Sequence, residues 1–173
     1  MIDLEIVHKG VFFSLYFLFF LASVIFIERL LYFVFAFPAE RKLLLKEAEG
    51  ADERGVEILY HTYVSKLKRG RGVIAFVITA SPLLGLLGTV LGIMNSFTTM
   101  AERGVSDITA VSKGIAFALQ ATALGIVIAV VALAYYHVVG GLVRSYETEI
   151  KKLILKAMAV SQDSGEKGGQ EVD

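Results

Sequence analysis

Three long runs without any acidic or basic residue constrain this chain more than any other feature. Residues 10–27, 72–101 and 114–143 contain no Asp, Glu, Lys or Arg. A helix crosses the hydrocarbon core of a bilayer with about 20 residues. Each run therefore predicts a transmembrane helix. The runs lack the alternation of barrel strands, so we expect an all-α membrane protein with three spans.

The composition excludes several other classes of protein. The chain has 17 basic and 17 acidic residues among 173, a formal net charge of zero, and 55% hydrophobic residues. Such a chain is neither disordered nor an ordinary nucleic-acid-binding protein. It has no Cys and only three scattered His, which argues against disulfides and a metal site. No hydrolase, metalloprotease or nucleotide-binding motif is present, so we expect no enzyme activity.

The charged residues divide the chain into spans and connecting segments. We expect a short N-terminus (1–9), a first span (10–37), a helical loop (38–71), a second span (72–101), a short loop (102–107), a third span (108–142), a helix continuing beyond the membrane (143–160) and a disordered tail (161–173). Asp3 and Glu5 argue against a cleaved signal peptide, so the first span should be retained.

The loop 38–71 carries a helical pattern of its own. Apolar residues recur three and four positions apart, as on one face of a helix: Val56, Leu59, Tyr60, Tyr63, Val64 and Leu67. We expect this face to pack against the chain's own helices, and a foreign partner is the alternative.

Basic residues predict the orientation of the spans. The loop 38–71 holds eight Lys and Arg and the segment after residue 143 holds five, whereas the N-terminus and the second loop hold one each. Cytoplasmic loops carry the excess of basic residues. The first loop and the C-terminus should therefore be cytoplasmic, and the N-terminus periplasmic. Glu28 and Arg29 should lie at the cytoplasmic boundary of the first span.

Small residues recur at helical spacing in the second and third spans. They are Gly85, Gly88 and Gly92 in the second, and Gly114, Ala118 and Gly125 in the third. Small residues allow membrane helices to approach closely. We therefore predict that these two faces pack together.

Four polar side chains in or beside these spans are candidates for an ion path. Thr89 and Thr122 lie near the middle of their runs, where a Thr either bonds back to its own helix or offers a hydroxyl that donates and accepts hydrogen bonds and so passes on a proton or helps to solvate an ion. Gln120 and Lys113 are further pore candidates. The alternative for Gln120 is a hydrogen bond to another helix, and for Lys113 an extended position at the outer boundary.

Three segments resemble one known family. Residues 85–97 (GLLGTVLGIMNSF), 114–125 (GIAFALQATALG) and 22–29 (ASVIFIER) resemble the MotA/TolQ/ExbB proton-channel family, in its ExbB/TolQ branch. The three matches lie in the family's order and with its topology.

This resemblance implies a homopentamer of three-span subunits in the bacterial inner membrane. The pentamer would surround the single helices of an ExbD/TolR-like partner, in two copies, whose aspartate accepts the proton. A TonB/TolA-like protein would carry force toward the outer membrane. Thr89 and Thr122 match the threonines that line the family's pore. The partners implied are these proteins and membrane lipid, with no nucleic acid and no cofactor beyond the transported ion, H⁺.

The chain departs from the family pattern in two places. Many relatives have Glu where this chain has Phe117, and most have a longer loop between the first two spans. Two alternatives therefore stay open beside the proton channel: a non-conducting membrane scaffold for a partner, and a sodium-driven relative.

Overall fold

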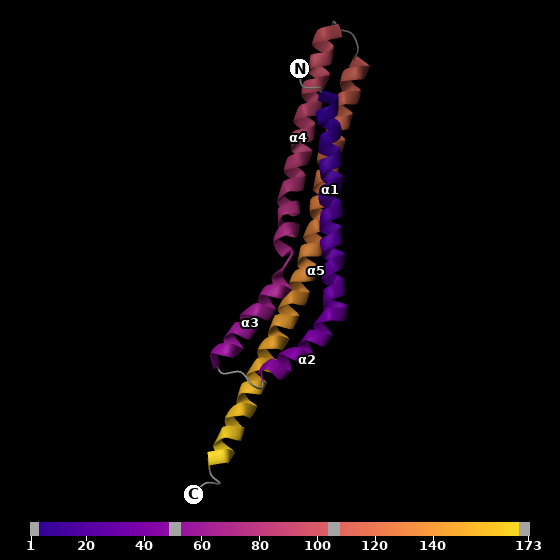
Figure 1. The fold of residues 1–173 in the computed structure, drawn as a ribbon. Coiled ribbons are helices and arrows are strands. Elements are labelled where there is room, and N and C mark those ends of the chain that lie inside the picture. The colour runs from indigo at the N-terminus through magenta and orange to yellow at the C-terminus, as the bar shows by residue number, and fades with distance from the viewer. Residues whose placement is uncertain (1–3, 49–52, 104–107, 170–173) are drawn as a thin grey trace. The chain divides into compact units, whose positions relative to one another are not determined.

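The structure, a computed structural model, describes residues 4–48, 53–103 and 108–169. In chain order its elements are α1 (Leu4–Leu31), the π-helical turn η1 (Tyr32–Ala36), α2 (Phe37–Ala48), α3 (Glu53–Lys68), α4 (Arg71–Arg103) and α5 (Ile108–Gly169) (Figure 1). Three stretches are long and apolar enough to cross a membrane: Lys9–Leu44, Arg54–Ala101 and Val111–Lys156. The predicted all-α membrane fold is confirmed.

The chain divides into two compact units. The first comprises Met1–Phe26 and Gly72–His137, and the second comprises Ile27–Arg71 and Val138–Asp173. Helices α1 and α5 each contribute a segment to both units.

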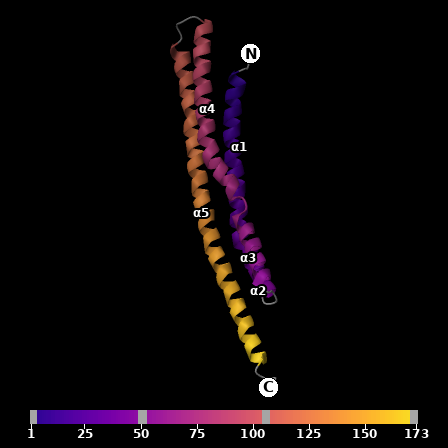
Figure 2. The same cartoon turned by 90° about the vertical axis from the view of Figure 1, so that its left-hand side faces the viewer.

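The first unit is a bundle of three helices, in which α1, α4 and α5 run side by side (Figures 1 and 2). Its buried core draws on all three: Val11, Leu15, Leu18 and Ala22 of α1, Ile74 and Val77 of α4, and Ile128 and Ala132 of α5. The buried positions on α1 recur every three or four residues, so one face of that helix packs inward. Outward residues such as Phe13 and Phe20 are exposed, as lipid-facing side chains of a spanning helix are.

In the second unit, α2 and α3 pack against the later part of α5. Helix α3 buries Val56, Tyr63, Val64 and Leu67, which belong to the apolar face predicted for the loop. An ion pair joins Arg41 of α2 to Glu149 of α5 at 2.9 Å. Exposed ion pairs contribute little to stability, so the buried apolar face is what holds the helices together. Helix α3 therefore packs against helices of its own chain, as expected from the sequence.

The turn between α3 and α4 depends on one glycine. Gly70 has a φ of 82°, a left-handed conformation that glycine adopts without steric cost. The Arg69 N–H bonds to the Lys66 carbonyl at 3.3 Å as α3 ends. A glycine in this conformation just beyond the last helical turn is a common helix terminator.

The helix boundaries differ from the expected segments at several points. Helix α5 is one continuous helix that covers the expected third span 108–142 and the expected helix 143–160. It also includes residues 161–169, where a disordered tail was expected. Residues 170–173 of that tail lie outside the described residues. Extending an existing helix gains a hydrogen bond per residue without a new nucleation cost, so the polar stretch stays helical. Helix α1 begins at Leu4, inside the expected N-terminal segment 1–9. Of the expected loop 102–107, only residues 102 and 103 are described, and they are helical.

Candidate ion-conducting site

Helices α4 and α5 approach so closely that a glycine is required at several contacts. A Cβ built at Gly85 would lie 2.8 Å from the Ala121 carbonyl oxygen and 2.9 Å from Thr122 Cα. One built at Gly125 would lie 2.5 Å from the Ser81 carbonyl oxygen. Since the atoms met are backbone atoms, a side chain there would push the helices apart.

The remaining small residues singled out from the sequence lie along the same interface. A Cβ at Gly88 would meet the Ala121 methyl group, and one at Gly92 would meet that of Ala118, each at 2.7 Å. Gly114 packs against the side chain of Ser96. The structure therefore brings the two small-residue faces together.

Thr89 and Thr122 meet at the centre of this interface. Their hydroxyl groups hydrogen-bond to each other. Thr122 also donates to the Gly85 carbonyl oxygen at 3.0 Å, and Thr89 lies 3.1 Å from the Ala118 carbonyl oxygen and 3.3 Å from that of Gly85. Each Thr thus bonds across to the other helix, and Thr89 bonds within its own helix as well.

The hydrogen count at this pair has a chemical consequence. Each hydroxyl group has one hydrogen. When one threonine donates this hydrogen to the second threonine, the second threonine donates its own hydrogen to a carbonyl oxygen. In one arrangement Thr89 donates to Thr122 and Thr122 donates to Gly85. In the reverse arrangement Thr122 donates to Thr89 and Thr89 donates to Ala118. A hydroxyl pair with two such arrangements is able to pass on a proton or to help solvate an ion.

Two further buried hydroxyl groups lie on α4. Ser81 and Ser96 are both buried and donate to carbonyls of their own helix, Ser81 to Val77 at 2.7 Å and Ser96 to Gly92 at 2.9 Å. Neither serine was predicted from the sequence as a functional candidate. Their spacing was the available signal, because Ser81 lies four residues before Gly85 and Ser96 four after Gly92.

The structure does not bring Gln120 and Lys113 to the threonine pair. Both are exposed on α5. Phe117, at the position where many relatives have Glu, shares this face and is 56% exposed. These residues present a polar and aromatic strip to the surroundings of the first unit.

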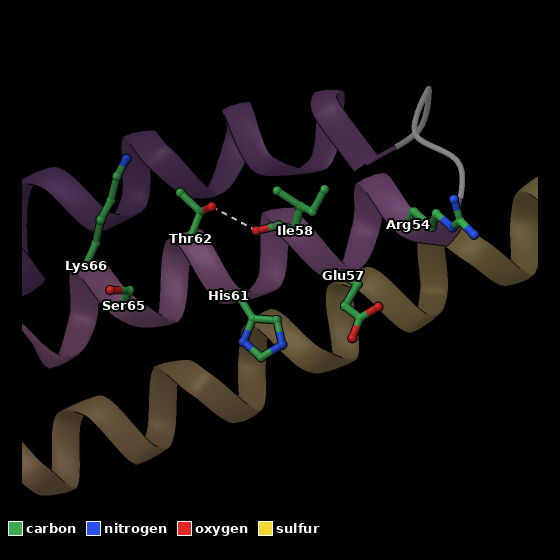
Figure 3. Close-up of a pocket in the computed structure, with 7 residues that line it drawn as sticks. All are labelled: Arg54, Glu57, Ile58, His61, Thr62, Ser65 and Lys66. Atoms are coloured by element: carbon green, nitrogen blue, oxygen red, sulfur yellow. Dashed lines mark hydrogen bonds between the residues drawn. The ribbon is translucent and has the colours of Figure 1, made fainter.

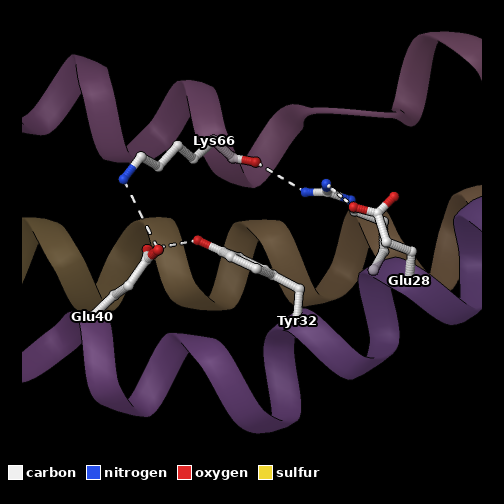
Figure 4. A network of polar contacts seen from close by, with 5 residues as sticks. Glu28, Tyr32, Glu40 and Lys66 are labelled. Atoms are coloured by element: carbon white, nitrogen blue, oxygen red, sulfur yellow. Dashed lines mark hydrogen bonds and ion pairs between the residues drawn. The ribbon is translucent and has the colours of Figure 1, made fainter.

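Arg29 lies in the second unit, where it caps a helix. Its side chain is only 4% exposed. The guanidinium donates to the Lys66 carbonyl oxygen at 3.1 Å and to Glu28 at 2.7 Å (Figure 4). Lys66 lies in the last turn of α3, where its carbonyl oxygen accepts from the Arg69 N–H in the turn but not from a following helical turn, and where a positive charge is favourable. Sequence reasoning missed this contact because 37 residues separate Arg29 from Lys66.

A shallow pocket on α3 is a second polar site in the second unit. It is lined by residues of that one helix: Arg54, Glu57, Ile58, His61, Thr62, Ser65 and Lys66 (Figure 3). The described residues contain no group of three or more metal-ligating side chains. The lining of the pocket comes from α3 alone and carries both acidic and basic side chains.

Comparison with known proteins gives consistent matches. A family model described as the MotA/TolQ/ExbB proton channel family matches residues 38–152. A biopolymer transport protein ExbB from Pseudomonas putida is 35% identical over 129 residues, which cover 72% of this chain and 39% of that protein. The protein of the same name from Salmonella typhimurium is 42% identical over 82 residues, covering 47% of this chain and 34% of that protein.

A shorter relative matches along most of its length. The biopolymer transport protein ExbB-like 2 of Helicobacter pylori is 30% identical over 148 residues, 86% of either chain. The chain thus spans well under half of the first two relatives and most of the third. These matches confirm the resemblance found at residues 85–97 and 114–125.

Proposed function

Because this chain belongs to the MotA/TolQ/ExbB proton channel family, we propose that it is the channel subunit of an ExbB/TolQ-type motor. The motor uses the ion gradient across the bacterial inner membrane to energise outer-membrane transport or envelope maintenance. The observation that carries this proposal is the hydroxyl pair of Thr89 and Thr122, placed between two carbonyls in helices that have no charged residue at that depth. The family is one of channel subunits rather than enzymes.

In the proposed mechanism the two threonines relay the transported proton. One hydroxyl oxygen takes a proton from pore water while the other hydroxyl releases its own proton to water or to the partner's acid, and rotation of the two hydroxyl groups then restores the first arrangement. The chain supplies no carboxylate at Phe117, and the acid that takes up the proton belongs to the partner's single span. Gln120 and Lys113, on the exposed face of α5, would meet the partner or the pore water.

The proposed assembly follows the resemblance. Five copies form a ring around two copies of an ExbD/TolR-like protein, and a TonB/TolA-like protein transmits the force. The exposed aromatic residues of α1 face lipid or a neighbouring copy. The N-terminus is periplasmic and the C-terminus cytoplasmic, as the distribution of basic residues favours.

Thr122→Val tests the role of the hydroxyl pair. Valine keeps the shape of the side chain but removes the donor, so the ring should assemble while partner-dependent proton flux in liposomes falls at least tenfold, the equivalent of about 1.4 kcal/mol. Thr79→Val is the matched control, because the exposed Thr79 hydroxyl bonds to carbonyls of its own helix, at 3.0 and 3.4 Å. Wild-type flux in Thr122→Val would refute the proposed role.

Phe117 stands where many relatives have Glu, and the missing carboxylate favours two alternatives, a non-conducting scaffold and a sodium-driven relative. A scaffold would support its partner's function after collapse of the proton gradient, whereas a motor would not. A sodium-driven relative would lose activity in sodium-free buffer, and a proton-driven one would keep it.

A further inference from the structure

The backbone changes its helical form where α1 ends. Between α1 and α2 lies η1, a single π-helical turn, and the Phe37 N–H bonds to the Tyr32 carbonyl five residues before it. Pro38 follows directly. Single π-helical turns are rare inside α-helices and recur at functional sites.

Pro38 accounts for this turn. Proline has no N–H, and in an α-helix its ring clashes with the carbonyl four residues earlier, here that of Val34. A wider turn relieves this clash. It also leaves the Phe33 carbonyl without a backbone donor, because Phe37 N–H is bonded to Tyr32 and Pro38 has no hydrogen to give.

A side chain from α5 supplies the missing donor. The Tyr146 hydroxyl donates to the Phe33 carbonyl oxygen at 3.5 Å. The Tyr146 ring lies parallel to that of Phe33, with centroids 5.2 Å apart, and contacts that of Phe37 at 4.1 Å. Both phenylalanines are buried. The ring contacts therefore aim the hydroxyl at the unpaired carbonyl.

A second tyrosine spans the same turn along the chain. The Tyr32 hydroxyl donates to Glu40 of α2 at 2.7 Å, and the Lys66 ammonium lies 3.9 Å from the same carboxylate (Figure 4). The turn is thus held at both ends by side chains as well as by its backbone.

We propose that η1 is a joint whose closed state depends on the Tyr146 hydroxyl, which replaces the N–H that Pro38 lacks. At 3.5 Å this hydrogen bond is long, so its loss shifts the balance between the closed and open states by a few-fold rather than abolishing the closed state. The joint opens when the Phe33 carbonyl oxygen accepts a hydrogen bond from a water molecule instead of from the Tyr146 hydroxyl. It closes when the Tyr146 hydroxyl donates to this oxygen again. This device rests on the geometry of the second unit alone and not on ion conduction.

Hydrogen exchange on the full chain in lipid nanodiscs tests the joint through a double-mutant cycle. Tyr146→Phe keeps the ring contacts and removes the hydroxyl, so the amides of residues 35–37 and 39–44 should exchange about fivefold faster, the equivalent of about 1 kcal/mol. In the Pro38→Ala background the backbone regains its donor. There, Tyr146→Phe should leave the exchange unchanged.

Tyr60→Phe is the matched control, because its hydroxyl makes a similarly long bond of 3.4 Å to Glu147 in the same unit. It should not change exchange at residues 35–44. Equal acceleration by Tyr146→Phe with and without Pro38 would overturn the proposal, as would no acceleration at all. Equal acceleration by Tyr60→Phe would also overturn it.

Discussion

At the scale of single residues, the candidate site depends on the absence of a side chain at Gly85 as much as on the hydroxyl groups of Thr89 and Thr122. Without a Cβ at Gly85, the backbone of α5 comes close enough for Thr122 to reach the Gly85 carbonyl. The same glycine therefore sets the distance between the helices and supplies an acceptor for the hydroxyl pair. Sequence reasoning identified Gly85 as a packing residue but did not identify its carbonyl as a hydrogen-bond acceptor.

Gly85→Ala should destabilise the protein because the new methyl group meets backbone atoms that cannot move independently. Overpacking of this kind costs about 1–3 kcal/mol. Gly10→Ala is the control, since a Cβ there meets nothing within 4 Å and alanine favours a helix. Thermal unfolding in a mild detergent should show a lower midpoint for Gly85→Ala only. Equal midpoints for the two variants would show that the close approach of α4 and α5 is wrong.

At the scale of helices, the sequence predicted what depends on local pattern. The three charge-free runs located the spans, and the spacing of Val56, Tyr63 and Leu67 located α3. Gly140 and Gly141 lie inside α5 and do not interrupt it. The end of α5 was not predicted, because the polar composition after residue 160 resembles a disordered segment.

Features that depend on distant residues were beyond prediction. The contact of Arg29 with the end of α3 and the hydrogen bond of Tyr146 with η1 each join positions far apart in the chain. No spacing rule connects such positions. The pairing of Thr89 with Thr122 was open for the same reason, since the sequence placed both at mid-span but did not fix how the two helices align.

The helix end at Gly70 gives a prediction at this scale. Gly70→Ala forces a side chain into a left-handed conformation, which costs about 1–2 kcal/mol. Gly72→Ala, two residues on and inside α4, meets nothing within 4 Å and should be neutral or slightly stabilising. Chemical or thermal unfolding of the two variants separates these cases. The conformation assigned to Gly70 would be contradicted by a neutral Gly70→Ala.

At the scale of the whole molecule, the chain exposes more apolar surface than a soluble protein tolerates. Phe13, Phe17 and Phe20 of α1 and Leu83 and Leu86 of α4 are all more than half exposed. Lipid or other subunits must cover such surface. The proposed ring uses part of it for contacts between copies and leaves the rest to lipid.

The native mass of the purified complex tests this assembly. We expect five copies of the chain, and five with two partner copies when an ExbD/TolR-like protein is co-expressed. A monomer or dimer that takes up no partner, in a detergent mild enough to preserve rings of this family, would contradict the proposed ring.

Proton flux through the wild-type complex is the most direct test of the central claim. The complex is reconstituted in liposomes with a pH-sensitive dye inside, and a membrane potential is imposed. In sodium-free buffer, we expect protons to enter liposomes that contain the chain and its partner faster than liposomes that contain the chain alone. Flux no greater than that of protein-free liposomes, from a complex shown to be intact, would contradict it.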